Sequence, residues 1–125
     1  MSNSCSNLAT AFLALNNFDQ ALEYINRSLE IDIAVANKKG QVIGYDNKAG
    51  ILLKAGKLNK ALEVVNKGIA LFENESSTTQ TLIDKSTRIL INSTKAKILN
   101  VIFEKTNQLD YLEQSTDIIL SLIHI

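Results

Sequence analysis

The sequence predicts an all-α fold made of antiparallel helical hairpins in series, about six helices with a long fifth helix. The 125 residues include no proline and only five glycines, so few residues interrupt a helix. Apolar residues recur at steps of three and four, the spacing that places side chains on one face of a helix. This pattern also recurs along the chain at a fixed distance, which is typical of helical-repeat proteins.

The clearest predicted hairpin covers residues 45–72. Gly56 separates two helical runs and can adopt the left-handed conformation that ends a helix. The second run carries one apolar stripe, made of Leu58, Ala61, Leu62, Val65, Gly68, Ile69 and Phe72. Small residues at Ala49, Ala61 and Gly68 let two helices approach to about 8–10 Å. Because the turn is short, the two helices are predicted to pack antiparallel.

A first copy of this hairpin precedes it at residues 3–31. Asn16-Asn17 takes the place of the turn, because asparagine tolerates left-handed backbone better than most residues. The second run then repeats the apolar stripe with Phe18, Ala21, Leu22, Ile25, Ser28 and Leu29. Ala21 and Ala61 occupy equivalent places in the two copies, so the separation between them is the period of the repeat.

The residues of the central hairpin resemble the tetratricopeptide repeat. The resemblance rests on Tyr45, Ala49, Leu52, Gly56, Leu58, Ala61, Val65, Gly68 and Ile69. Lys48 departs from the pattern, since the family has an apolar residue there. The resemblance implies a right-handed array of hairpins in a single domain over residues 1–125. Its copies would be repeat 1 at about 3–33, repeat 2 at about 41–74 and a degenerate repeat 3 at about 78–123.

The period that separates Ala21 from Ala61 exceeds the usual ~34 residues of the family. It is similar to that of a longer variant found in bacterial signalling and regulatory proteins. Residues 33–44 carry the extra length and are expected to lengthen one helix and the start of the next, with a break at residues 37–40. A long helix is expected from about 78 to 105. A break at Asn92-Ser93-Thr94 is the alternative, because Ser93 can cap a helix.

The third copy fits the pattern least well. Ala96, Leu99, Asn100 and Phe103 would form the packed face of its first helix. The turn would lie at Thr106-Asn107-Gln108, and a sixth helix would follow. Since Leu112 stands where a small residue is expected, we expect looser packing in this hairpin than in the central one.

Charge and composition exclude several classes of protein. Lys and Arg together number 13, as do Asp and Glu, so the chain is formally neutral. A dedicated nucleic-acid binder carries a basic excess, and we expect no nucleic-acid partner. No apolar run approaches the ~18–20 residues of a membrane span, and the start lacks the pattern of a secretory signal. A single cysteine cannot form an internal disulfide. We therefore expect a cytoplasmic protein without a membrane partner.

Candidate catalytic residues are few. Cys5 occupies the inward position that Tyr45 holds in the central copy, so we expect a small core residue. His124 has no cluster of Cys, His or Asp around it of the kind that binds a metal, and it is expected to be a solvent-exposed tail residue. There is no Gly-rich phosphate loop and no G-x-S-x-G sequence. We expect no enzymatic activity, no cofactor and no metal.

The resemblance implies a binding groove on the concave side, which the first helix of each hairpin lines. The groove-facing positions would be Asn3, Ser6, Asn7, Thr10, Leu13, Ile43, Asp46, Asn47, Gly50, Lys54, Thr94, Lys97, Ile98, Val101 and Lys105. The candidate binding residues among them are Asn3, Asn7, Thr10, Ile43, Asn47, Gly50, Lys54, Lys97 and Val101. Such a groove would hold a peptide or protein ligand, so the predicted function is that of a scaffold or adaptor.

Two other functions stay open. One is a helical-repeat binder of single-stranded RNA, although the groove positions contain no aromatic residue for base stacking. The other is a sensor or regulatory fragment of a larger bacterial signalling protein. The C-terminal residues Ile118, Ile119, Leu122 and Ile123 are apolar, and a homodimer through these uncapped ends is a further expectation.

Charge is concentrated in the middle of the sequence. Residues 38–67 contain seven lysines and two acidic residues, whereas both flanking parts are acidic. A basic middle could steer an acidic peptide towards the protein. The plainer interpretation is that these lysines form the solvated sides of helices.

Overall fold

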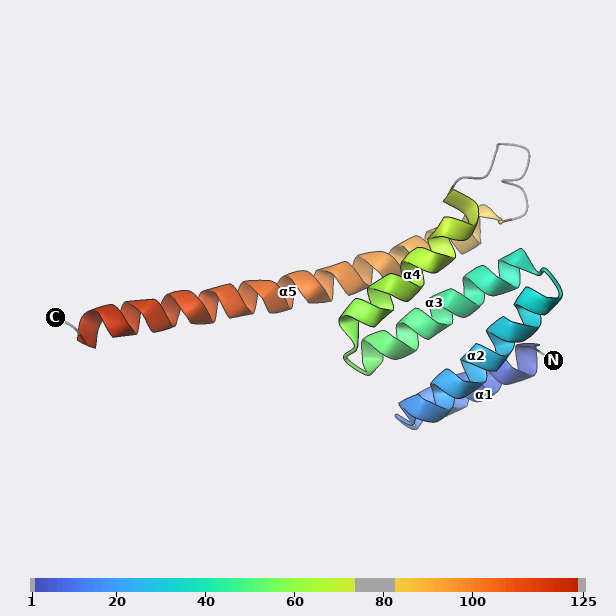
Figure 1. Cartoon of the computed structure of the whole chain (residues 1–125), viewed down its shortest axis with the longest axis horizontal. Coiled ribbons are helices and arrows are strands. Elements are labelled where there is room, and N and C mark those ends of the chain that lie inside the picture. Colours follow the sequence, from blue (N-terminus) through green and yellow to red (C-terminus); the bar gives the residue numbers. More distant parts are fainter. Residues whose placement is uncertain (1, 74–82, 124–125) are drawn as a thin grey trace.

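The computed structural model describes residues 2–73 and 83–123, with side chains in the last part of the chain given up to Leu109 and at Glu113 and Thr116. These residues are all helical apart from short connections, which confirms the predicted all-α class. The five helices are α1 (Ser2–Ala14), α2 (Phe18–Ala34), α3 (Lys38–Lys54), α4 (Leu58–Glu73) and α5 (Lys85–Ile123). The first four form two stacked antiparallel hairpins, and α5 packs against α3 and α4 (Figure 1).

The first three connections share one geometry and are evenly spaced along the chain. Asn16, Ala36 and Gly56 each have positive φ, at 59°, 57° and 79°. In each case the next backbone N–H donates to a carbonyl of the last helical turn, as Asn37 N does to Asp32 O at 2.8 Å. This is the hydrogen bond of the Schellman motif, which ends a helix at a left-handed residue.

The second connection differs from the prediction. The break lies at residues 35–37, and the expected break at 37–40 falls mostly within the first turn of α3. Asn37 instead caps α3, since its side-chain oxygen accepts a hydrogen bond from Gly40 N at 3.0 Å. Ala36 adopts the left-handed conformation, at a cost of roughly 1–2 kcal/mol. Residues 33–34 end α2 and residues 38–44 begin α3, so the extra residues lie at the end of one helix and the start of the next, as expected.

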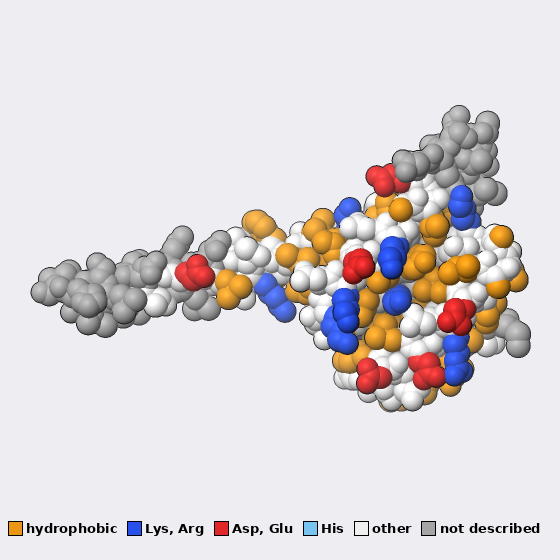
Figure 2. Space-filling model, viewed as in Figure 1, with side chains coloured by type: hydrophobic (Ala, Val, Ile, Leu, Met, Phe, Trp, Pro, Cys, Tyr) orange, Lys and Arg blue, Asp and Glu red, His pale blue; other side chains and the backbone are white. Residues whose placement is uncertain are grey.

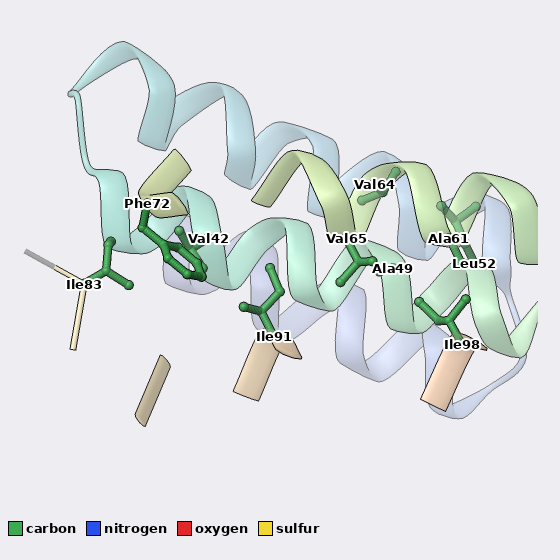
Figure 3. Close-up of a cluster of buried hydrophobic side chains, with 10 residues drawn as sticks. All are labelled: Val42, Ala49, Leu52, Ala61, Val64, Val65, Phe72, Ile83, Ile91 and Ile98. Carbon is green, nitrogen blue, oxygen red and sulfur yellow. The ribbon is translucent and has the colours of Figure 1, made fainter. Parts of the chain in front are cut away.

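Small side chains let the helices of the array approach closely. Ala21, Ala49 and Ala61 are 0 % exposed, as the hairpin pattern predicts. Gly68 of α4 lies against Tyr45 of α3 and Ile91 of α5. The main core joins α3, α4, α5 and Ile83, which precedes α5. Its buried residues are Val42, Ala49, Leu52, Ala61, Val64, Val65, Phe72, Ile83, Ile91 and Ile98 (Figure 3).

The predicted turn and sixth helix of the third copy are wrong, because α5 is one helix of 39 residues. At ~1.5 Å per residue it is about 58 Å long. The segment at 106–108 contains no glycine or proline, and the Thr106 hydroxyl donates to Ile102 O at 2.9 Å within the helix. Continuity through residues 92–94 agrees with the favoured prediction. The expected helix start near residue 78 lies outside the described residues.

The register of α5 also differs from the prediction. Ile91 and Ile98 are fully buried against α3 and α4, whereas Leu99 and Phe103, expected to pack, are 43 % and 64 % exposed. Two buried residues that lie two helical turns apart, Ile91 and Ile98, are enough for α5 to pack against both α3 and α4. Because no sixth helix folds back, nothing in the described structure covers Phe103. Beyond Ile102, all the described side chains are exposed and α5 projects from the bundle (Figure 1).

Candidate functional site

Two adjoining hollows lie between α1 and α3, and we call the surface they form the α1/α3 groove. The larger has a volume of about 180 Å³ and is lined by Asn3, Ser6, Asp32, Asn37, Lys39, Gly40, Ile43 and Gly44. The smaller, of about 50 Å³, is lined by Ser6, Ala9, Thr10, Leu13, Ile25, Asn47 and Ile51. Ser6 belongs to both, so the hollows are neighbours along α1.

Helical periodicity positions these residues. Ser6 and Thr10 are four apart on α1, and Ile43, Asn47 and Ile51 follow the same spacing on α3. The hydroxyl of Ser6 forms a 3.0 Å hydrogen bond with the hydroxyl of Ser28 on α2, which fixes the position of the Ser6 side chain. The lining of the smaller hollow is mostly apolar and includes buried Ala9 and Ile51. The larger hollow is lined mostly by polar residues, including the buried carboxylate of Asp32.

Four of the nine candidate binding residues line this groove, namely Asn3, Thr10, Ile43 and Asn47. Asn7 is exposed on α1 but does not line either hollow. Gly50 and Lys54 continue along α3, where a Cβ added at Gly50 would meet nothing within 4 Å. The two candidates on α5 lie apart from the hollows: Lys97 is exposed and Val101 is half-buried.

Two positions that were expected to face the groove are buried instead. Ile98 is 0 % exposed in the core between α5 and its neighbours. Asp46 is 8 % exposed, and its Oδ1 atom has no hydrogen-bond partner among the described residues. Burial raises the pKa of the Asp46 carboxyl, while the neighbouring Thr94 hydroxyl and the charge of Lys97 oppose this shift. The contact arises because α5 docks directly over Asp46, which the misaligned third copy did not predict.

The described residues include neither a metal-binding cluster nor a helix able to span a membrane. No three His, Cys, Asp or Glu side chains within residues 2–73 and 83–123 could together hold a metal ion. None of the described helices, α5 included, combines the length and hydropathy needed to cross a membrane. Cys5 is half-buried rather than a full core residue, and His124 lies outside the described residues.

Stacked antiparallel hairpins with a groove along their first helices define a helical-repeat protein. A family model described as "Tetratricopeptide repeat" matches residues 2–74, more than half of the chain. The protein therefore belongs to the tetratricopeptide repeat family, and the match covers α1 to α4. Searches of curated proteins and of solved structures found no match. Tetratricopeptide repeats generally serve as protein-interaction scaffolds and are typically not catalytic.

Proposed function

We propose that the protein is a binding scaffold whose α1/α3 groove holds an extended peptide segment of a partner protein. The observation that supports this most is the pair of adjoining hollows, in which residues from two different repeats meet around Ser6. Asn3 and Asn47 each carry an amide that can both donate and accept hydrogen bonds. An extended peptide backbone offers the complementary groups, and its side chains can enter the hollows.

The bound segment would continue along α3 over Gly50 and towards Lys54. The absence of a side chain at Gly50 leaves room for the ligand backbone, since apart from the adjacent residues and the backbone of α3 itself nothing lies within 4 Å of the added Cβ position. Asn7 on α1, together with Lys97 and Val101 on α5, would contact the parts of the ligand outside the hollows. The scaffold would act in the cytoplasm and perform no chemistry of its own.

Binding of single-stranded RNA is the less favoured alternative. The residues lining the two hollows include no aromatic side chain for base stacking. Their one lysine, Lys39, lies 3.5 Å from a carboxylate oxygen of Asp84 and so has a partner already. The role of a regulatory fragment is compatible with the same groove.

A homodimer is a separate part of this proposal. The sequence places Ile118, Ile119, Leu122 and Ile123 in the part of α5 that projects from the bundle. Their side chains lie outside the described ones, so the proposal rests on the apolar sequence alone. Sedimentation at several concentrations tests it, and a monomer at all of them would rule it out.

A peptide selection tests the groove. Peptides selected from a random library on the purified protein should bind wild type and lose affinity for Gly50→Gln, because glutamine suits a helix and fills the open space above α3. Asn47→Ala should weaken binding about five- to tenfold, as expected for one or two lost hydrogen bonds. Asn66→Ala, an exposed change on α4, is the matched control. Unchanged binding to Gly50→Gln would place the site elsewhere.

A further inference from the structure

A third hollow lies between α2 and α4, with α3 at its base. Its volume is about 270 Å³, and its lining is Leu22, Asn26, Lys48, Leu52, Lys57, Lys60, Glu63, Val64 and Lys67. We call it the lysine hollow. It shares no lining residue with the α1/α3 groove. Figure 2 shows Lys and Arg side chains gathered around apolar ones in the middle of this face.

The hollow concentrates positive charge on a neutral chain. Four lysines and one glutamate give its lining a formal charge of +3, whereas the whole protein has a formal charge of zero. None of the four lysines forms an ion pair within residues 2–73 and 83–123. Their mutual repulsion is therefore left without a nearby counter-charge other than Glu63, and an anionic ligand would relieve it.

Lys48 stands at a position better suited to an apolar residue. The residue at the same place in the first repeat is Leu8. The Lys48 side chain is half-buried, and its pKa is lowered by this burial and further by the charge of Lys67. Placing an ammonium group there costs stability, which a role in ligand binding would explain.

Lys57 also replaces a residue with a structural role. Asn17 and Asn37 immediately precede α2 and α3, and their side-chain oxygens cap these helices by accepting from Gln20 N and Gly40 N. The corresponding residue before α4 is Lys57, whose carbonyl accepts from Ala61 N at 3.0 Å. An ammonium group cannot accept a hydrogen bond, so α4 lacks the cap that its two predecessors have.

The base of the hollow is apolar. Leu22 from α2, Leu52 from α3 and Val64 from α4 lie between the lysines. A phosphate ion would gain nothing from these three side chains. A peptide that carries an apolar side chain between carboxylates would use both the base and the charged rim.

We propose that the lysine hollow binds an acidic segment of a partner protein, with an apolar side chain on Leu22, Leu52 and Val64 and carboxylates at Lys48, Lys57, Lys60 and Lys67. This site is separate from the α1/α3 groove. A partner could therefore occupy both surfaces, or two partners could bind together.

Fluorescence anisotropy with a labelled peptide of alternating glutamate and leucine tests the proposal. Wild type should bind it more tightly than the glutamine–leucine and glutamate–serine peptides, with affinity that falls as salt rises. Each lysine should contribute about two- to fivefold. The double variant Lys60→Gln/Lys67→Gln should therefore lose about four- to 25-fold. Lys85→Gln/Lys105→Gln on α5 removes the same charge from exposed positions and should change affinity less than about twofold.

Two further variants separate binding from folding. Lys48→Leu and Lys57→Asn should raise the denaturation midpoint and still weaken the glutamate–leucine peptide about two- to fivefold. Equal losses in both double variants, or equal binding of the glutamine–leucine peptide, would overturn the proposal. Displacement by inorganic pyrophosphate at concentrations at which sodium sulfate has no effect would identify a phosphate site instead and also overturn it. Gly50→Gln should leave this peptide unaffected, so failure here is distinct from failure of the groove.

Discussion

Replacing Gly68 by alanine should destabilise the protein although it improves the helix propensity of α4. Gly68 lies in the middle of α4, where an added Cβ would contact Ile91 Cδ1 and would lie 3.0 Å from Tyr45 Cβ. Ile91 is fully buried and has little space into which to move. Tyr45 Cβ is bonded directly to the backbone of α3, so this close contact can be relieved only if α3 itself moves.

The sign of the effect follows from two opposing magnitudes. Alanine in place of glycine within a helix stabilises it by about 0.8–1 kcal/mol. Forcing a methyl group into a packed core costs about 1–3 kcal/mol. The net change in the free energy of unfolding should therefore be a loss of up to about 2 kcal/mol.

Gly50→Ala is the matched control for this experiment. Gly50 also lies within a helix, but a Cβ there meets nothing within 4 Å. Only the propensity gain remains, so this variant should be more stable than wild type by about 0.8–1 kcal/mol. Urea denaturation followed by circular dichroism measures both. Equal stabilisation by the two substitutions would refute the close approach of α3, α4 and α5.

Three other predictions follow from the same structure. Asp46→Asn should stabilise the protein at pH 7 by on the order of 1 kcal/mol, because it removes a buried carboxylate with an unpartnered oxygen. Folding raises the pKa of the Asp46 carboxyl above its unfolded value of about 4. Wild type should therefore lose stability as the pH rises from about 4 through the folded pKa, and thermal melts of Asp46→Asn should lack this loss. Asn37→Ala should cost about 1–2 kcal/mol in urea denaturation, more than Asn17→Ala, because Asn37 accepts at 3.0 Å and Asn17 at 3.4 Å. Asn107→Pro should lower the helical circular dichroism signal and leave the denaturation midpoint unchanged, since the described side chains around it are exposed.

The two hairpins could be predicted from sequence because their signals are local. Gly56 and Asn16 indicate turns with a left-handed residue, and the buried alanines follow helical spacing. The turn at Ala36 could not be placed, because alanine seldom adopts positive φ. The turn at Ala36 lies midway between those at Asn16 and Gly56. Asn37, expected to be part of the break, caps α3 instead.

The last helix shows where local signals fail. Thr106, Asn107 and Gln108 are polar, yet all three are tolerated in a helix, so polarity alone did not mark a turn. The face that α5 presents depends on α3 and α4 rather than on its own sequence. Four residues of the groove on α1 and α3 could be predicted to lie together, because both helices belong to the regular hairpins. The burial of Ile98 and Asp46 could not be predicted, because it depends on how α5 packs against α3.

The most direct test of the proposed function is to map a library-selected peptide onto the protein by nuclear magnetic resonance. Titration into ¹⁵N-labelled protein should shift the amide signals of Ser6, Thr10 and Asn47 first, and that of Asn66 on α4 little. Shifts concentrated on α4, or absent from both α1 and α3, would contradict a ligand site between the first helices of the two repeats.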